Sequence, residues 1–336
     1  MTNPRLLLVI LNYRTPEMTL KAAEAALREM AGIDGEIVIV DNGSGDDSEA
    51  VIDAGIEAAG WDRTRVILKQ SGHNGGFGAG NNFAIRQGLS DGTRPDFVYL
   101  LNSDALPDKG AIRILLDYLI AHREVGAAGS YVHGPQGDPH QTAFRFPTIA
   151  GELEGAARTG FITRMFPSAV IPLEISDVPI AVDWVAGASV LLRQKALDEI
   201  GLFDETYFLY FEETDLCLRA RRAGWQVHYV PASEVTHIGS VSTGMKTWRR
   251  TPRYWFDSRL HYFTKNHGAG YAAAATLARI AGAAIWRLRV LTSSKPLVDP
   301  PRFLSDLTFH ALRRLLRPGP KPQASPTPLQ RRETHQ

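Results

Sequence analysis

Apolar runs alternate with segments of helical periodicity through the first 130 residues, and this alternation constrains the fold more than any other feature. The run at residues 6–11, which follows Arg5, is continuously apolar, which is typical of a strand covered on both faces in a parallel sheet. Regular alternation of strands and helices indicates right-handed crossovers and a doubly wound, mostly parallel α/β sheet flanked by helices. We predict strands at residues 5–11, 36–40, 65–68 and 97–101, and helices at residues 16–30, 46–59, 78–88 and 110–122.

Small polar residues follow three of these strands. The first strand ends in Asn12, the second in Asp41-Asn42-Gly-Ser, and the fourth in Asn102-Ser-Asp104. In doubly wound sheets, ligands bind beyond the carboxyl ends of the strands. Asp41 is suited to accept a hydrogen bond from the imide N–H of uracil or thymine, and Asp104 is a hard oxygen ligand for Mg²⁺ or Mn²⁺. Each motif alone is compatible with a capped turn, but three together indicate a nucleotide site.

A glycine-rich loop follows the third strand at residues 73–82, His-Asn-Gly-Gly-Phe-Gly-Ala-Gly-Asn-Asn. Glycines there allow the backbone to approach a phosphate or a sugar closely. The loop lacks the spacing of a dinucleotide-binding fingerprint and the Lys-Ser/Thr pair of a P-loop. Both a nicotinamide-dependent oxidoreductase and a P-loop kinase are therefore disfavoured.

Paired carboxylates stand at the start of a predicted helix, directly after an aromatic run at residues 207–211. Glu212, Glu213 and Asp215 fall in the first helical turn, where the helix dipole favours the ionised form. A carboxylate in this position can act as a general base, and the aromatic side chains can line a pocket beside it. The alternative is an ordinary amphipathic helix whose acids and later arginines complement its dipole without any chemistry.

Five motifs occur in the order seen in a known family. They are Asp-Asn-Gly-Ser at 41–44, Asn-Gly-Gly-Phe-Gly-Ala-Gly-Asn-Asn at 74–82, Leu-Asn-Ser-Asp at 101–104, Trp-Val-Ala-Gly-Ala at 184–188 and Phe-Glu-Glu-Thr-Asp-Leu-Cys-Leu-Arg at 211–219. From about residue 5 to about residue 242, the chain resembles inverting family-2 glycosyltransferases of the GT-A fold. The branch is similar to bacterial rhamnosyltransferases of cell-surface polysaccharide synthesis.

The resemblance implies a role for each matching residue. Asp41 would hold the nucleobase, and Asn74 and Asn82 would frame the ribose and diphosphate. Asp104 takes the place of the last Asp of the Asp-x-Asp metal motif, and His237, which precedes Gly239-Ser240, is a second metal ligand. The other expected nucleotide-sugar contacts are Asn12, Asn42, Gly75, Gly76 and Asn102, and the expected acceptor contacts are Asp183, Trp184, Gly187 and Tyr210. The base aligns with Glu213, where the family usually has Asp, and Glu212 and Asp215 remain alternatives.

On this resemblance we expect transfer of a sugar from dTDP-L-rhamnose to a glycan or lipid-linked acceptor, with inversion and with Mg²⁺ or Mn²⁺. A UDP-sugar-dependent enzyme of the same family is the nearest alternative. A sugar nucleotidyltransferase would need a basic glycine-rich loop after the first strand, and residues 11–16 do not form one. A catalytically silent, membrane-associated carbohydrate-binding protein is the alternative from another class.

Charge and cysteine content bear on location and partners. Cys217 is the only cysteine and the N-terminus lacks the layout of a signal peptide, so we expect a cytoplasmic protein. The net charge of +1 conceals an asymmetry, because 11 Lys and Arg stand against 3 Asp and Glu from residue 271 onward. An acidic body with a basic C-terminal part argues against nucleic acid and favours a peripheral position on the cytoplasmic face of the inner membrane.

The expected domain organisation follows these patterns. Residues 1–245 would form the GT-A domain, with a nucleotide-sugar-binding half at 1–130 and an acceptor-binding half at 131–245. Within the second half, residues 131–182 show no regular pattern, and residues 183–193 have the pattern of a strand. Residues 246–317 would be a helical extension, in which 271–291 and 303–316 are amphipathic enough to lie on a membrane or simply to pack on the core. Residues 318–336 have the composition of a disordered tail.

Overall fold

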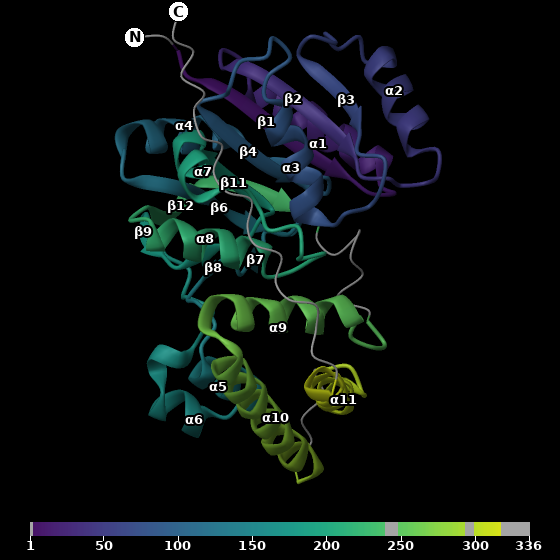
Figure 1. The fold of residues 1–336 in the computed structure, drawn as a ribbon. Helices are drawn as coiled ribbons and strands as arrows, with labels where there is room; N and C mark the ends of the chain where they lie inside the picture. Colours follow the sequence, from purple (N-terminus) through teal and green to yellow (C-terminus); the bar gives the residue numbers. More distant parts are fainter. Residues whose placement is uncertain (1–2, 239–247, 293–298, 317–336) are drawn as a thin grey trace, which may run out of the picture.

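The computed structural model describes residues 3–238, 248–292 and 299–316, and its core is a mixed sheet of ten strands (Figure 1). The main strand order is β3-β2-β1-β4-β11-β6-β12-β5. The strands are β1 (Arg5–Asn12), β2 (Asp34–Asp41), β3 (Val66–Gln70), β4 (Phe97–Asn102), β5 (Ala105–Pro107), β6 (Val125–His133), β7 (Pro139–His140), β8 (Ala143–Phe144), β9 (Ile180–Val182), β10 (Trp184–Val185), β11 (Ser189–Arg193) and β12 (Gln226–His237).

Helices cover both faces of this sheet. The helices are α1 (Pro16–Glu29), α2 (Ser48–Ala58), α3 (Phe77–Gln87), α4 (Ala111–Ala121), α5 (Ile149–Ala157), α6 (Gly160–Met165), α7 (Gln194–Ile200), α8 (Glu212–Arg222), α9 (Arg253–His267), α10 (Ala269–Leu291) and α11 (Phe303–Leu316). Buried side chains of α1, α2 and α4 share one hydrophobic core with the sheet, and those of α3, α7 and α8 share the other. The predicted doubly wound architecture is confirmed.

The parallel strands bring the predicted polar motifs to one edge. In the register of β1 and β2, Asn12 pairs with Asp41, and in that of β1 and β4, Leu11 pairs with Asn102. All three strand ends therefore lie side by side, as parallel geometry requires. The strand predicted at 183–193 is instead divided: β10 pairs with β8 in a separate two-stranded sheet, while β11 joins the main sheet between β4 and β6.

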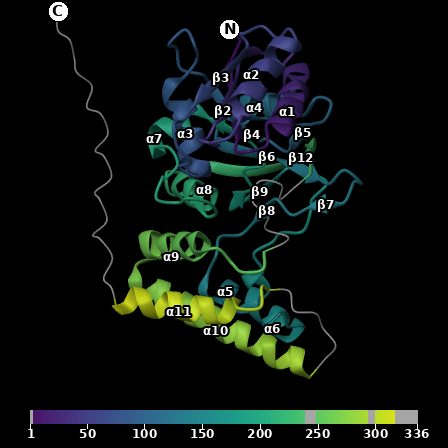
Figure 2. The same cartoon turned by 90° about the vertical axis from the view of Figure 1, so that its right-hand side faces the viewer.

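The segment 131–182, whose sequence shows no regular pattern, contains helices α5 and α6. Helix α5 packs along α10 (Figure 2). Small residues make this contact: a Cβ on Gly282 would lie 2.6 Å from the Leu153 carbonyl oxygen and 2.8 Å from the Ala156 Cβ. Helices that meet through Gly and Ala carry a weak apolar signal, and the sequence pattern therefore did not reveal α5.

Helices α5, α6, α9, α10 and α11 form a helical layer below the sheet in both views (Figures 1 and 2). A buried ion pair holds it together. The Arg259 guanidinium donates to the Glu152 carboxylate at 2.8 and 3.0 Å and to the Thr276 hydroxyl at 3.1 Å, and Arg279 approaches the same carboxylate at 3.3 Å. Glu152 on α5, Arg259 on α9 and Arg279 on α10 thus join three helices at one point.

We predict that Glu152→Ala destabilises the protein by about 3–5 kcal/mol, because Arg259 would remain buried without its counter-charge. The matched control is Asp53→Ala, which removes a carboxylate from the half-exposed pair with Arg63 and should cost less than about 1 kcal/mol. Denaturant titration measures both. Equal losses would show that the buried pair is not what holds the layer together.

Candidate active site

Asp41 is fixed in position by Asn12. The Asn12 side-chain amide donates to Asp41 Oδ1 at 2.7 Å and to the Ser44 hydroxyl at 3.2 Å, and its oxygen accepts from the Thr19 hydroxyl at 2.8 Å. The Ser44 hydroxyl also donates to Asp41. Asn12 is completely buried. It therefore positions the Asp41 carboxylate rather than contacting a ligand itself.

The glycine-rich loop is tied to the end of β2 and to the segment before α8. The Asn42 amide donates to Asn74 Oδ1 at 3.1 Å and to the Gly76 carbonyl at 3.2 Å. Gly76, next to Gly75, has a φ of 89°, and a Cβ there would collide with the Phe208 carbonyl. The same carbonyl accepts a hydrogen bond of 3.0 Å from the Phe77 backbone amide. Glycine is therefore required at position 76 for this approach.

Asn82 is engaged by the segment that follows α7. Its amide donates to the Phe203 carbonyl at 2.8 Å and to Glu205 Oε1 at 2.9 Å, and its oxygen accepts from the Phe203 amide at 3.1 Å. The side chain is fully buried. These contacts attach α3 to residues 203–205, so the geometry gives the predicted donor contact of Asn82 no support.

Asp104 and His237 come together at the ends of adjacent elements. His237 Nε2 lies 2.9 Å from Asp104 Oδ1, and 3.5 Å from the side-chain amide of Asn102. The pairing of β12 with β5, in which His237 faces Ala105, sets this approach. A carboxylate and an imidazole nitrogen are both suitable ligands for a divalent cation. Gly239-Ser240, the rest of the late motif, lies outside the described residues.

A cluster that the sequence did not predict lies at the other end of β5, which Asp108 follows directly. Ligand atoms of Asp108, His133 and Glu234 all lie within 4.8 Å of one another. Burial disfavours protonation of His133, but its hydrogen bonds to the Gly134 carbonyl and to Asp108 more than offset this and raise its pKa. Its ring nitrogens lie 2.9 Å from the Gly134 carbonyl oxygen and 3.0 Å from Asp108 Oδ2, and the cluster is a second candidate site for a divalent cation. The three residues come from separate segments and had no common sequence signal.

Strained backbone presents Glu213. Tyr210 and Phe211 both have positive φ, 70° and 71°, directly before α8, a conformation that non-glycine residues adopt at a cost and that is common at functional sites. Glu213 Oε1 accepts the Gly187 amide at 3.2 Å. A Cβ on Gly187 would lie 2.7 Å from that oxygen and 2.9 Å from Phe77 Cζ. Glu213, Gly187 and Phe77 therefore meet where only glycine fits.

The two glutamates differ in environment. Burial, and next the charge of Glu213, raise the pKa of Glu212 well above its usual value. Its Oε2 has no hydrogen-bond partner among the described residues, and the side chain is 1% exposed. Burial also raises the pKa of Glu213, which is partly exposed. The protonated form of Glu212 is thus favoured, and Glu213 is the carboxyl that remains accessible.

Asp215, the third candidate base, is occupied by structural contacts. It accepts from Arg219 at 2.9 Å, Lys265 at 2.8 Å and Asn266 at 2.8 Å, and it is completely buried. Burial alone would raise its pKa, but the charges of Arg219 and Lys265 more than offset this and lower it. The geometry is that of an anchor between α8 and α9.

The predicted acceptor residues divide into two groups. Asp183 accepts from the Phe146 backbone amide at 2.7 Å and from Arg221, and Trp184 stacks on Phe144 with ring centroids 4.1 Å apart. Both are engaged in packing around the small sheet. Gly187 lies beside Glu213, as described above.

Tyr210 belongs to an aromatic cluster with residues of the C-terminal part, which the sequence analysis missed. Its ring centroid lies 5.9 Å from that of Trp248 and 6.3 Å from that of Tyr254, and the latter lies 5.3 Å from Phe208. By contrast, Tyr207 packs into the buried contact with α9. Only part of the aromatic run therefore faces this cluster.

The two halves of the site are joined by backbone contacts. The Asn102 amide donates to the Ala188 carbonyl at 3.0 Å, one residue from the Gly187 amide that binds Glu213. The Phe77–Phe208 hydrogen bond joins the glycine-rich loop to the segment before α8. The site thus places the polar ends of β1, β2 and β4, the Asp104–His237 pair and the partly exposed carboxyl of Glu213 around one region.

Comparison with known proteins agrees with this arrangement. The family described as "Glycosyltransferase like family 2" matches residues 4–261. An N-acetylglucosaminyl-diphospho-decaprenol L-rhamnosyltransferase of Mycobacterium tuberculosis is 32% identical over 217 residues, covering 62% of this chain and 68% of that protein. Rhamnosyltransferase WbbL of Escherichia coli K12 is 29% identical over 165 residues, covering 48% and 60%.

Among solved structures, the mannosyltransferase PcManGT of Pyrobaculum calidifontis, in complex with GDP-Man and Mn²⁺, superposes with a TM-score of 0.56 at 14% identity, over 95% of this chain and 82% of that one. This likeness shows the fold. The chain belongs to the family-2 glycosyltransferases and has the GT-A fold, as the sequence motifs predicted.

Proposed function

We propose that this glycosyltransferase transfers L-rhamnose from dTDP-L-rhamnose to a lipid-linked or glycan acceptor, with inversion, in cell-surface polysaccharide synthesis. The observation that carries the proposal is the convergence of Asp41, the Asp104–His237 pair and Glu213 on one site. The rhamnosyltransferase names of two relatives support the choice of sugar. A UDP-sugar donor is the alternative, because the imide edges of uracil and thymine are the same.

The chain offers separate groups for each part of the donor. Asp41, held by Asn12 and Ser44, is placed to accept the imide N–H of the base. The backbone of Asn74 and Gly75, both partly exposed, would approach the diphosphate or sugar, whereas Gly76 is buried against the Phe208 carbonyl. Asp104 and His237 would hold Mg²⁺ or Mn²⁺, and a bound cation would neutralise charge on the leaving diphosphate.

Glu213 is the proposed general base. It takes the proton from an acceptor hydroxyl, whose oxygen forms a bond to the anomeric carbon while the bond from that carbon to the diphosphate oxygen breaks. Attack from the face opposite the leaving group inverts the configuration. Neutral Glu212 adds no second charge beside the base. General-base assistance of this kind contributes about 10²–10⁴-fold to rate.

The proposed location of the enzyme is the cytoplasmic face of the inner membrane, where it would meet a lipid-linked acceptor. In the described part of the chain, no helix is both long enough and apolar enough to cross a membrane. The excess of basic residues after residue 270 supports attraction to an anionic surface. The chain would then bind the membrane peripherally.

A donor panel tests the function. We expect release of dTDP from dTDP-L-rhamnose in the presence of a sugar-diphosphate-lipid acceptor and Mn²⁺, and an inverted anomeric configuration in the product by NMR. Turnover of UDP-sugars instead would favour the alternative donor. Binding of nucleotide sugars without turnover of any would favour a catalytically silent carbohydrate-binding protein.

We predict that Glu213→Gln lowers kcat by roughly 10²-fold or more while donor affinity is retained, because the amide cannot accept the proton. In the wild type, kcat/KM should rise with pH through the raised pKa of Glu213, since the base acts when deprotonated. The variant should lose this rising limb. Glu212→Gln is the matched control and should cost less, because Glu212 is already neutral. The reverse order of effects would move the base to Glu212.

We predict that Asp104→Ala and His237→Ala each remove the Mn²⁺-dependent part of dTDP binding, because each deletes a ligand of the proposed cation. His133→Ala is the control for the neighbouring cluster and should leave that part unchanged. Calorimetry with and without Mn²⁺ measures the difference. If His133→Ala alone abolishes it, the cation belongs to the cluster of Asp108, His133 and Glu234.

A further inference from the structure

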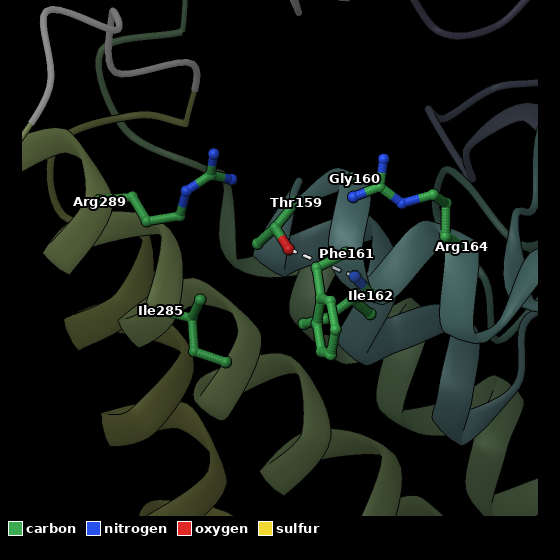
Figure 3. Close-up of a pocket in the computed structure, with 7 residues that line it drawn as sticks. All are labelled: Thr159, Gly160, Phe161, Ile162, Arg164, Ile285 and Arg289. Carbon is green, nitrogen blue, oxygen red and sulfur yellow. Dashed lines mark hydrogen bonds between the residues drawn. The ribbon is translucent and has the colours of Figure 1, made fainter.

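A groove separates α6 from α10 in the helical layer (Figure 3). Its volume is about 540 Å³, and its lining includes Phe161, Ile162 and Ile285. Arg164 from α6 and Arg289 from α10 stand on opposite sides of the groove, and in Figure 3 both guanidinium groups lie on the same rim, with Phe161 and Ile285 between and below them. The groove therefore has an apolar floor and a basic rim.

The helix faces beside the groove are unusually apolar for an exposed surface. On α10, Leu277, Leu288 and Leu291 are 67%, 65% and 82% exposed, and on α6 Phe161 and Met165 are 66% and 52% exposed. Most of the large exposed apolar side chains of the described residues lie in the helical layer. A concentration of this kind marks an interaction surface, whereas single exposed apolar residues need no explanation.

The spacing shows that each helix presents these side chains on one side. On α6, Phe161 precedes Arg164 and Met165 by three and four positions, and on α10, Ile285 precedes Leu288 and Arg289 in the same way. Residues so spaced are neighbours on a helix surface. Each helix thus contributes one apolar and one basic side chain to the groove lining, Phe161 with Arg164 and Ile285 with Arg289.

Charge identifies the partner. Arg164 is exposed and makes no ion pair with any described residue, and the chain from residue 271 onward carries a net charge of +8. Phosphate groups above a layer of acyl chains match a basic rim above an apolar floor, because arginine heads bind phosphates while apolar side chains enter the interface. Arg289 also donates to the Arg158 carbonyl at 2.9 Å, so the argument from charge rests on Arg164, to which a neutral protein partner would offer no counter-charge.

We propose that the groove and the adjoining faces of α6 and α10 dock on an anionic phospholipid bilayer, with Arg164 and Arg289 binding lipid phosphates and Phe161, Met165 and Leu288 entering the interface. This face would be the surface through which the enzyme binds the membrane, and the inference rests on the proposed function. The base helix α8 lies on the sheet side of α9, and the docking face lies on the other side (Figure 2).

Point variants test this better than truncation, because α10 packs along α5 and its removal would expose that helix. In Phe161→Ser/Arg164→Ser we expect the partition coefficient on phosphatidylglycerol vesicles to fall about fivefold or more, since one basic residue near an anionic surface is worth about 1 kcal/mol and an apolar contact is also lost. The matched control is Ile120→Ser/Arg123→Ser, which removes an exposed apolar and an exposed basic residue at the end of α4.

Co-sedimentation with the full chain measures the partition, and vesicles of phosphatidylcholine alone should bind weakly. Equal partition of wild type and the α6 variant, or equal binding to neutral and anionic vesicles, overturns the proposal. Turnover on a water-soluble acceptor should be the same in wild type and the α6 variant. Vesicle binding is measured without donor or acceptor. The chain can therefore bind vesicles even if it does not transfer rhamnose, and it can transfer rhamnose even if it does not bind vesicles.

A labelled cysteine tests which face inserts. Cys217 is the only cysteine and is buried, so a fluorophore on Phe161→Cys reports position 161. Its emission should shift to the blue with phosphatidylglycerol vesicles, and the same label on Ile120→Cys should not respond. A response of the α6 label to protein concentration without vesicles would make this face a contact between two copies of the chain and would overturn lipid docking.

Discussion

The close approach of Gly76 to Phe208 is the contact on which the site depends. The glycine-rich loop comes from the half of the sheet that carries Asp41, and Phe208 begins the strained turn that aims Glu213. The hydrogen bond from the Phe77 amide to the Phe208 carbonyl, 3.0 Å long, fixes the distance between these segments. A side chain at position 76 would push them apart. The separation of the donor edge from the base is therefore set by backbone atoms rather than by flexible side chains.

The helical layer supports the base from the opposite side. Asp215, two residues after Glu213, is bound to Lys265 and Asn266 on α9, and Lys265 and His261 also bind Asp204. Helix α9 in turn is joined to α5 and α10 by Arg259. Polar contacts thus connect α8 to α9, and α9 to the helices α5 and α10. The layer supports the position of α8 whether or not it also binds a membrane.

The sequence predicted the parts of this structure that are encoded locally. The strands and helices of the first 130 residues follow from their periodicity, and parallel geometry then places Asp41 beside Asn12. The direction in which a side chain points is not encoded locally. Asn82, for example, binds Phe203, which lies 121 positions away in the sequence. Helix α5 escaped prediction because Gly and Ala form its contact with α10. The cluster around His133 assembles only when β6 and β12 pair.

The glutamate at position 213, where aspartate is usual in the family that the chain resembles, has a physical counterpart in the structure. The longer side chain reaches Gly187, and the missing side chain at that position leaves the room that the extra methylene needs, since a Cβ would lie 2.7 Å from Oε1. The same hydrogen bond stabilises the carboxylate and limits the effect of burial on the pKa of Glu213. Glu212 receives no such contact from Gly187 and is fully buried, so the pair divides into one neutral carboxyl and one that can take up a proton. Position 187 and position 213 are therefore coupled, and the identity of either residue limits what the other can be.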